Sequence, residues 1–133
     1  MTELTNSVTR TVAVGAPVLY DEVLLQTGCG ECHRKGTGSV KMRANGVYRV
    51  TFTANIAGAT ANVGVGLAMY LGGVRMPETD MIVVPAYDGN ANNVAKVTLV
   101  KNCCGDYDRI DVRNIGTTEV VVTNPVLIIE RVC

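Results

Sequence analysis

Strict alternation of apolar and polar residues is the feature that most limits the fold of this chain. In residues 46–56, GVYRVTFTANI, apolar residues occupy the even-numbered positions from 48 onward, and most odd-numbered positions are polar; below, parity means this choice between even and odd positions. The apolar set is Tyr48, Val50, Phe52, Ala54 and Ile56. Successive side chains of a β-strand point to opposite faces, so this pattern predicts a half-buried strand. Residues 63–71 and 110–113 repeat the alternation, and no window has the helical period. We therefore predict an all-β fold.

Turn-forming sequences separate these predicted strands. They are RANG (43–46), LGG (71–73), YDGNANN (87–93) and NIGTT (114–118), all rich in glycine, asparagine and aspartate. Many short strands at such spacing favour an antiparallel sandwich or barrel. Near the N-terminus, Val12, Val14, Ala16 and Val18 share one parity and predict a further strand face. Within the last apolar segment, Pro125 lacks a backbone N–H and predicts a bend or bulge.

Length and charge limit the organisation and the partners. The chain has 133 residues, which suits a single domain spanning 1–133. Twelve basic residues balance twelve acidic ones, so no net charge favours nucleic acid or an acidic membrane. The first residues, MTELTNSVTRTV, lack a basic start and an apolar run, and we expect synthesis in a cytoplasm without a secretion signal. Residues 1–10 are polar and predict an N-terminal arm that anchors to a partner.

A C-x-x-C-H motif at residues 29–33 raises three kinds of chemistry. This spacing is that of covalent haem attachment, but the segment leads into a glycine-rich strand pattern rather than a helix, which disfavours haem. Zinc is the second alternative, with Cys29, Cys32 and His33 as ligands and Cys103 or Cys104 as the fourth. Neighbouring residues of a strand point to opposite faces, so Cys32 and His33, or Cys103 and Cys104, would not readily bind the same zinc ion. Free thiols at a strand end are the favoured interpretation, and no cofactor is expected.

Catalytic motifs are missing from the sequence. It contains no G-x-S-x-G, no Walker loop, and no cysteine–histidine pair with a third orienting group. Asp108, Arg109, Asp111 and Arg113 alternate with apolar residues and predict a solvated strand face with cross-strand ion pairs. We therefore expect a protein that is not an enzyme.

The segment from Ile56 to Leu71 carries no charged side chain. In a strand with one face in water, the water-facing positions usually carry charged residues. Here small residues occupy those positions, which predicts that both faces of this strand are covered. A second copy of the chain is the simplest cover. The expected oligomer interface comprises Val63, Val65, Leu67, Met69 and Leu71.

Three stretches carry a family resemblance. The sequences GSVKMRANGVYRVTFTANI, VTLVKNCCGDYDRIDVRNIG and VVVTNPVLIIERV resemble the early, late and closing strands of the jelly rolls found in complement globular heads and tumour necrosis factors. The whole chain is also similar to small phage proteins with this jelly roll, on VGAPVLY, CGECHRKGTG, KNCCGD and IIERV. The resemblance implies an antiparallel jelly-roll sandwich that assembles as a homotrimer.

The resemblance also implies a function and a location. It indicates a non-enzymatic phage virion protein, a capsid decoration or a head-fibre or fibre component, located in the virion and contacting capsid or other virion proteins. Its outer loops are candidates for a host-surface glycan. In the resembled fold the cysteine-containing turns approach one another, so a disulfide or thiol cluster among Cys29, Cys32, Cys103 and Cys104 is an open alternative. The rival functions are a secreted or surface-displayed ligand-binding jelly roll and a small metal- or haem-binding redox protein.

Overall fold

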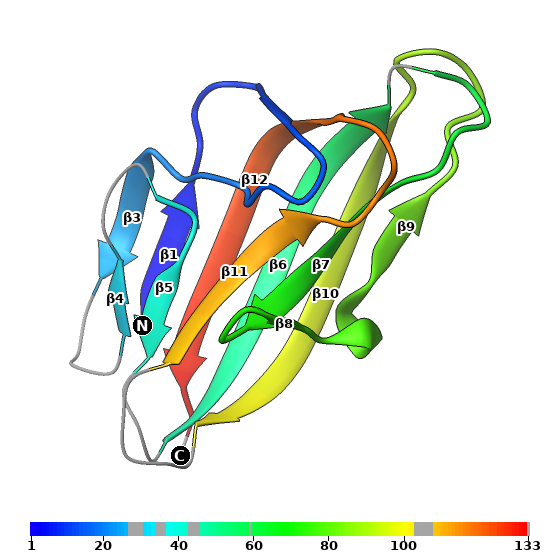
Figure 1. Ribbon diagram of the computed structural model, residues 1–133. Coiled ribbons are helices and arrows are strands. Elements are labelled where there is room, and N and C mark those ends of the chain that lie inside the picture. The colour runs from blue at the N-terminus through cyan, green and yellow to red at the C-terminus, as the bar shows by residue number, and fades with distance from the viewer. Residues whose placement is uncertain (27–30, 34–36, 43–45, 59, 103–107, 133) are drawn as a thin grey trace.

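The computed structural model describes residues 1–26, 31–33, 37–42, 46–58, 60–102 and 108–132, with only the backbone described at 31–33, 102 and 108. In these residues the chain forms two antiparallel sheets, which Figure 1 shows as two layers packed face to face. Sheet A contains β1 (Thr2–Thr5), β2 (Arg10–Val12), β3 (Glu22–Gln26), β6 (Gly46–Gly58), β10 (Ala91–Asn102) and β12 (Val120–Arg131). Sheet B contains β4 (Glu31–His33), β5 (Val40–Met42), β7 (Val65–Leu71), β8 (Val74–Arg75), β9 (Met81–Val83) and β11 (Asp108–Asn114). A single-turn 3-10 helix, η1 (Pro77–Thr79), precedes β9.

The strand order is that of a jelly roll. Sheet A runs β10-β6-β12-β1-β3, with β2 also paired to β12. Sheet B runs β4-β5-β11-β7-β8, with β9 also paired to β7. The chain crosses repeatedly between the two layers, from β3 to β4, from β5 through β6 to β7, and from β9 through β10 and β11 to β12. The predicted antiparallel sandwich is therefore confirmed.

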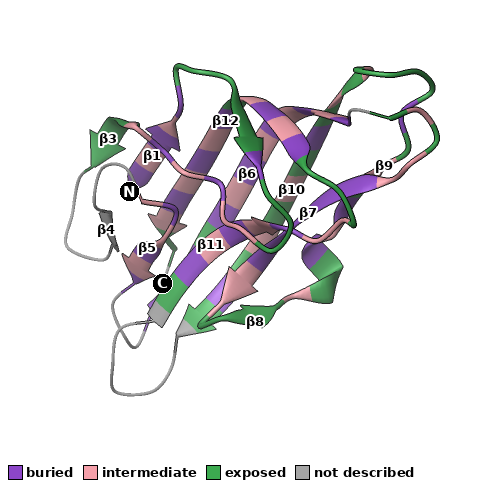
Figure 2. Ribbon diagram, turned by 45° about the horizontal axis from the view of Figure 1, so that its top comes forward, coloured by how far each residue is buried: buried purple, intermediate pink, exposed green. Residues whose placement is uncertain are grey.

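The core lies between the two sheets, and β6 supplies its largest share. The parity predicted to be buried is buried: Tyr48, Val50, Phe52 and Ile56 have no exposed surface. Figure 2 shows the resulting stripes of buried and partly exposed residues along β6 and β12. From sheet B, Leu67, Met69, Ile110 and Val112 close the core from the other side.

Two turn predictions have a clear structural outcome. Gly72 and Gly73 adopt positive φ angles of 59° and 83° in the β7–β8 turn, a conformation that glycine adopts without a Cβ clash. At Pro125 the register between β12 and β6 shifts between Thr123 and Val126, and Asn124 has a φ of 50°. The predicted bulge is therefore confirmed.

Two predictions near the N-terminus are wrong. Residues 2–5 are not an arm, because β1 is inserted between β12 and β3 and buries Thr2, Leu4 and Asn6. The predicted face from Val12 to Val18 is interrupted, since Val14 is 55% exposed. The chain turns there, with the amide of Ala16 donating to the carbonyl of Ala13 at 3.0 Å and Gly15 at a φ of 77°.

Truncation of Phe52 tests the central role of β6. Phe52→Ala removes a fully buried ring from the middle of the core, and we expect a loss of about 3–5 kcal/mol in the free energy of unfolding. Urea denaturation followed by far-UV circular dichroism measures this loss. Val74→Ala, at a residue 69% exposed in β8, is the control and should change the stability by about 0.5 kcal/mol or less. Equal losses in the two variants would contradict the assignment of the core.

Candidate functional site

The predicted oligomer interface on β7 lies inside the chain. Val65, Leu67 and Met69 are 2%, 0% and 0% exposed, and all three belong to the core between the sheets. A second copy cannot reach them without opening the sandwich, so the interface prediction is wrong for these three residues. Val63 is half-buried, and Leu71 is partly buried against the same core.

The other side of β7 is covered by the same chain. Gly66 and Ala68 are buried, and a Cβ at Gly66 would lie 3.2 Å from the Cγ1 of Ile82 and 3.3 Å from the Cγ1 of Ile115. The hydroxyl of Thr79, in η1, accepts a hydrogen bond from the Met69 amide at 2.9 Å. Coverage of both faces, predicted from the missing charges, is therefore confirmed, but the cover is intramolecular.

The surface left open is the outer side of sheet A, which we call the sheet A face. Its residues are those of β6, β10 and β12 whose parity points away from the core: Val47, Arg49, Thr51, Thr53, Asn55, Ala57, Ala91, Asn93, Ala95, Val97, Leu99, Lys101, Val121, Thr123, Val126, Ile128 and Glu130. Most are β-branched, small or amide side chains. Among the described residues, no element of the chain forms a third layer over them.

Charges on the sheet A face are few and mostly neutralised. Arg49 and Glu130 are direct partners across β6 and β12, and they form an ion pair in which the Arg49 Nε donates to Glu130. Lys101 lies at the end of β10. The middle of the face, from Thr51 to Ala57 along β6, has no charged side chain in this strand or in its paired stretches of β10 and β12 other than the inward Lys96. A solvated face of this size ordinarily carries more charge.

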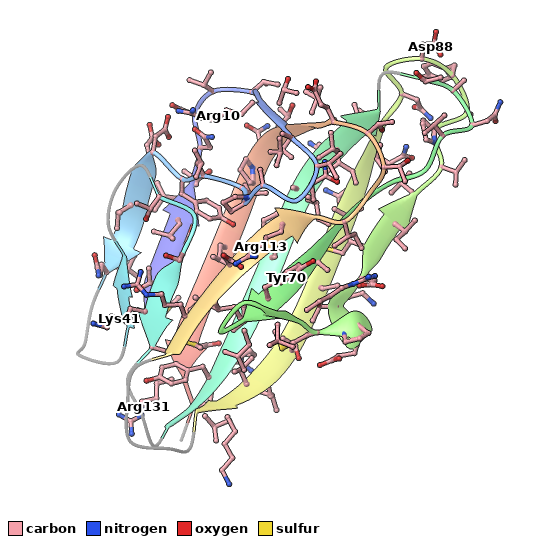
Figure 3. The ribbon with its side chains drawn as sticks, in the orientation of Figure 1. Arg10, Lys41, Tyr70, Asp88, Arg113 and Arg131 are labelled. Atoms are coloured by element: carbon pink, nitrogen blue, oxygen red, sulfur yellow. The ribbon has the colours of Figure 1, made fainter. Side chains whose placement is uncertain are left out.

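Sheet B has the opposite character on its outer side. Arg113 is bidentate to Asp111, with nitrogen–oxygen distances of 3.1–3.2 Å, and its guanidinium lies 4.7 Å from the centre of the Tyr70 ring. Figure 3 labels Arg113 and Tyr70, which lie close together over β11 and β7. Lys41 and Arg109 are partners across β5 and β11 on the same side. Asp111 and Arg113 thus form an ion pair on the outer side of sheet B, but the pair lies within β11 and is not the cross-strand pair that the sequence predicted.

Strand β10 adds an open edge to the sheet A face. Within the described chain, β10 pairs with β6 alone, so the backbone groups on its other side have no ladder partner in sheet A. Its outward residues Val97 and Leu99 are 61% and 65% exposed. A long edge strand with apolar side chains is a site for association unless something covers it.

The Cys–His segment falls mainly outside the described residues. Cys29, Cys103, Cys104 and Cys133 lie outside them, and Cys32 and His33 are described only by their backbone in β4, opposite Lys41 and Val40 of β5. Among the described side chains, no three His, Cys, Asp or Glu residues gather as metal ligands would. The zinc, haem, disulfide and free-thiol interpretations stay predictions.

Tyr20 and Arg75 are described residues with a shifted pKa. Burial, and after it the charge of Asp111, raises the pKa of the Tyr20 phenol far above its ordinary value, so the phenol stays protonated. A hydrogen bond to Asp80 raises the pKa of Arg75, which therefore stays charged. Both shifts move the pKa of the group further from neutral pH, which argues against these two side chains as a general acid or base.

Membrane-spanning helices were also sought. No helix in the described part of the chain has the length and apolarity needed to cross a bilayer.

Comparison with known proteins identifies the fold. No protein-family profile matches the chain. No curated protein sequence matches it. Among solved structures, the chain is similar to Eiger TNF from S. frugiperda, with a TM-score of 0.76 and 12% identity over 100% of this chain and 92% of that one. It is also similar to murine APRIL, with a TM-score of 0.67 and 13% identity over 97% of this chain and 98% of that one. The globular domain of zebrafish complement 1qA matches with a TM-score of 0.63 and 14% identity over 93% of each chain. The chain therefore has the C1q/TNF-like jelly-roll fold that its strand sequences resemble.

A matched pair of glycine substitutions tests the intramolecular cover of β7. Gly66→Ala places a Cβ 3.2 Å from both the Ile82 side chain and the Met81 carbonyl, whereas Gly64→Ala meets only ordinary contacts at 3.8 and 3.9 Å. We expect Gly66→Ala to be less stable than Gly64→Ala by about 1–3 kcal/mol in urea denaturation, because the packed neighbours must move.

The oligomeric state of the same two variants gives the second readout. Size-exclusion chromatography with light scattering should report the same mass for both variants. If Gly66→Ala abolished oligomers while the stability of its monomer stayed unchanged, β7 would again be the favoured oligomer interface.

Proposed function

We propose that the chain is a non-enzymatic assembly module that forms homotrimers through the sheet A face. The proposal rests mainly on one observation: this face, formed by β6, β10 and β12 and without charged side chains in its middle, has no cover within the described chain. Burying it against a second copy removes β-branched and small side chains from water, which is favourable at about 25 cal/mol per Å² of apolar area.

Two different surfaces support a ring rather than a two-fold dimer. The sheet A face is broad, while the β10 edge with Val97 and Leu99 is a narrow apolar ridge beside it. A contact between the edge of one copy and the face of the next is heterologous, and such contacts close into a ring when the rotation permits. The sequence resemblance to trimeric jelly rolls supports three copies.

The Arg49–Glu130 pair is suited to burial in this contact. The two charges already neutralise each other within one chain, so covering them leaves no net charge away from water. An unpaired ion in the same place is costly, by several kcal/mol. The pair therefore lets the face carry polar groups without opposing assembly.

A charge on the face tests the trimer. Val97→Lys introduces an unpaired ammonium on the exposed apolar ridge of β10, and we expect the association constant to fall by about 10²-fold or more. Native mass spectrometry over a concentration series measures the distribution of monomers and trimers.

The matched control is Val14→Lys, the same change at an exposed valine in the loop before β3. It should leave the trimer intact. A monomeric wild-type protein, or equal effects of the two substitutions, would contradict the proposal.

For the biological role, we propose a structural component of a phage virion, on the capsid surface or in a fibre. This proposal is supported by the sequence similarity in CGECHRKGTG and KNCCGD, and a self-assembling jelly roll is compatible with it. Since β1 belongs to sheet A, attachment to a capsid partner would use a surface of the folded trimer rather than a free N-terminal arm.

Quantitative mass spectrometry of purified phage particles tests the virion role. Peptides of this chain should appear in fixed proportion to the major capsid protein and remain after high-salt washing. A secreted ligand-binding module, the alternative role, would be recovered from the medium and be absent from the particles. That second result would overturn the virion role and leave the trimer unaffected.

A further inference from the structure

A cavity of about 410 Å³ is lined by β2 and the segment that follows it. Figure 3 labels Arg10, one of its lining residues, near one end of the sandwich. Apolar side chains dominate its lining, with Arg10 and Thr11 as the polar members: Arg10, Thr11, Val12, Ala13, Pro17 and Leu19, together with Ala16. Its volume is within the range of about 300–1,000 Å³ typical of small-molecule sites.

Both walls of the cavity are held by hydrogen bonds to the sheets. On one side, β2 pairs with β12 from Arg10 to Val12. On the other, the amide of Val18 donates to Val112 at 2.7 Å and the amide of Gly15 donates to Asn114 at 3.0 Å.

Asn114 ties the two walls together. Its buried side chain donates to the carbonyl of Val12 at 3.0 Å, while its backbone amide donates to Ala16 at 3.0 Å. The cavity is therefore preformed, which lowers the entropic cost of binding.

Arg10 supplies a positive charge with unused hydrogen-bond donors. The Arg10 side chain is 44% exposed, and among the described residues its ion pair is with Asp21, at 3.7 Å between Nη2 and Oδ2, which is too long for a hydrogen bond. Arg10 donates no hydrogen bond to any residue, within the part of the chain whose contacts are described. Asp21 instead accepts a bond from the Ser7 amide. A guanidinium has five N–H donors in a planar fork that matches a carboxylate.

We propose that this cavity binds a small amphipathic carboxylate. Its apolar chain lies against Val12, Ala16 and Leu19, and its carboxylate pairs with the Arg10 guanidinium. The lining offers no anionic side chain, so a cationic ligand of the same size has no partner in it. A neutral ligand loses the charge-assisted hydrogen bonds and keeps only the apolar contact. None of the lining residues belongs to the set that defines the sheet A face, so variants of the cavity and variants of the face can be tested separately.

Octanoate is the probe, followed by carbon–proton correlation spectra of the methyl groups. We expect saturable shifts of the methyls of Val12, Ala13, Ala16 and Leu19, with smaller changes elsewhere. Octanol should bind about tenfold or more weakly, since a hydrogen bond to a charged group contributes about 1.5–3 kcal/mol. Octylamine should not shift these methyls. Equal affinity for octanol and octanoate, or octanoate shifts confined to other residues, would overturn the proposal.

Three variants separate the charge from the cavity. Arg10→Gln should weaken octanoate binding by about tenfold or more and leave octanol binding unchanged. Ala16→Leu fills the cavity and should abolish both. Asp21→Asn keeps the acceptor for the Ser7 amide but removes the competing negative charge, and should strengthen octanoate binding by about two- to fivefold.

The increase in octanoate affinity expected for Asp21→Asn distinguishes an effect on binding from a loss of the fold. A gain in affinity cannot arise from a damaged fold, whereas a loss can. Unchanged octanoate affinity in both Arg10→Gln and Asp21→Asn would overturn the role of the guanidinium.

Discussion

The rest of the structure depends on the pairing of β6 with β10 on one side and β12 on the other. These three long strands form the continuous part of sheet A, and β6 directs Tyr48, Val50, Phe52 and Ile56 into the core. Because strand side chains alternate, burying this set necessarily turns the intervening residues outward. The sheet A face is therefore a direct consequence of the core: a shift of one residue in register would exchange the two sets.

Alternation was enough to predict the fold class, but it could not predict which layer covers which strand. The burial of Phe52 and of Val112 follows from parity alone. The insertion of β1 does not, because TELT is short and polar, and only its pairing with β12 and β3 gives its backbone partners. Val14 fails for a different reason, since the left-handed turn at Gly15 interrupts a pattern that is regular in sequence.

The candidate interface shows a sharper limit of sequence reasoning. Missing charge between Ile56 and Leu71 indicates a covered segment, but it does not reveal whether the cover is the same chain or another. The cover comes from Ile82 and Ile115, residues 16 and more positions away that the fold brings over Gly66. A usable signal was present elsewhere: the closing segment is apolar in both parities, with Val126 and Ile128 as well as Leu127 and Ile129. One parity fills the core, and the other lies on the sheet A face.

The two outer faces divide the surface between different environments. On sheet B, Arg113 is stacked on Tyr70 and held by Asp111, an arrangement that is compatible with water on its open side. On sheet A, Arg49 and Glu130 form an ion pair beside the uncharged middle of the face, and each charge is neutralised by the other. When the charges of a face are already paired within the chain, covering that face with a second copy costs little desolvation free energy. Arg10 differs from both, because its donors remain unused beside an apolar cavity. The proposed self-association and the proposed ligand binding thus use different residues of one small sandwich, so substitutions can test them separately.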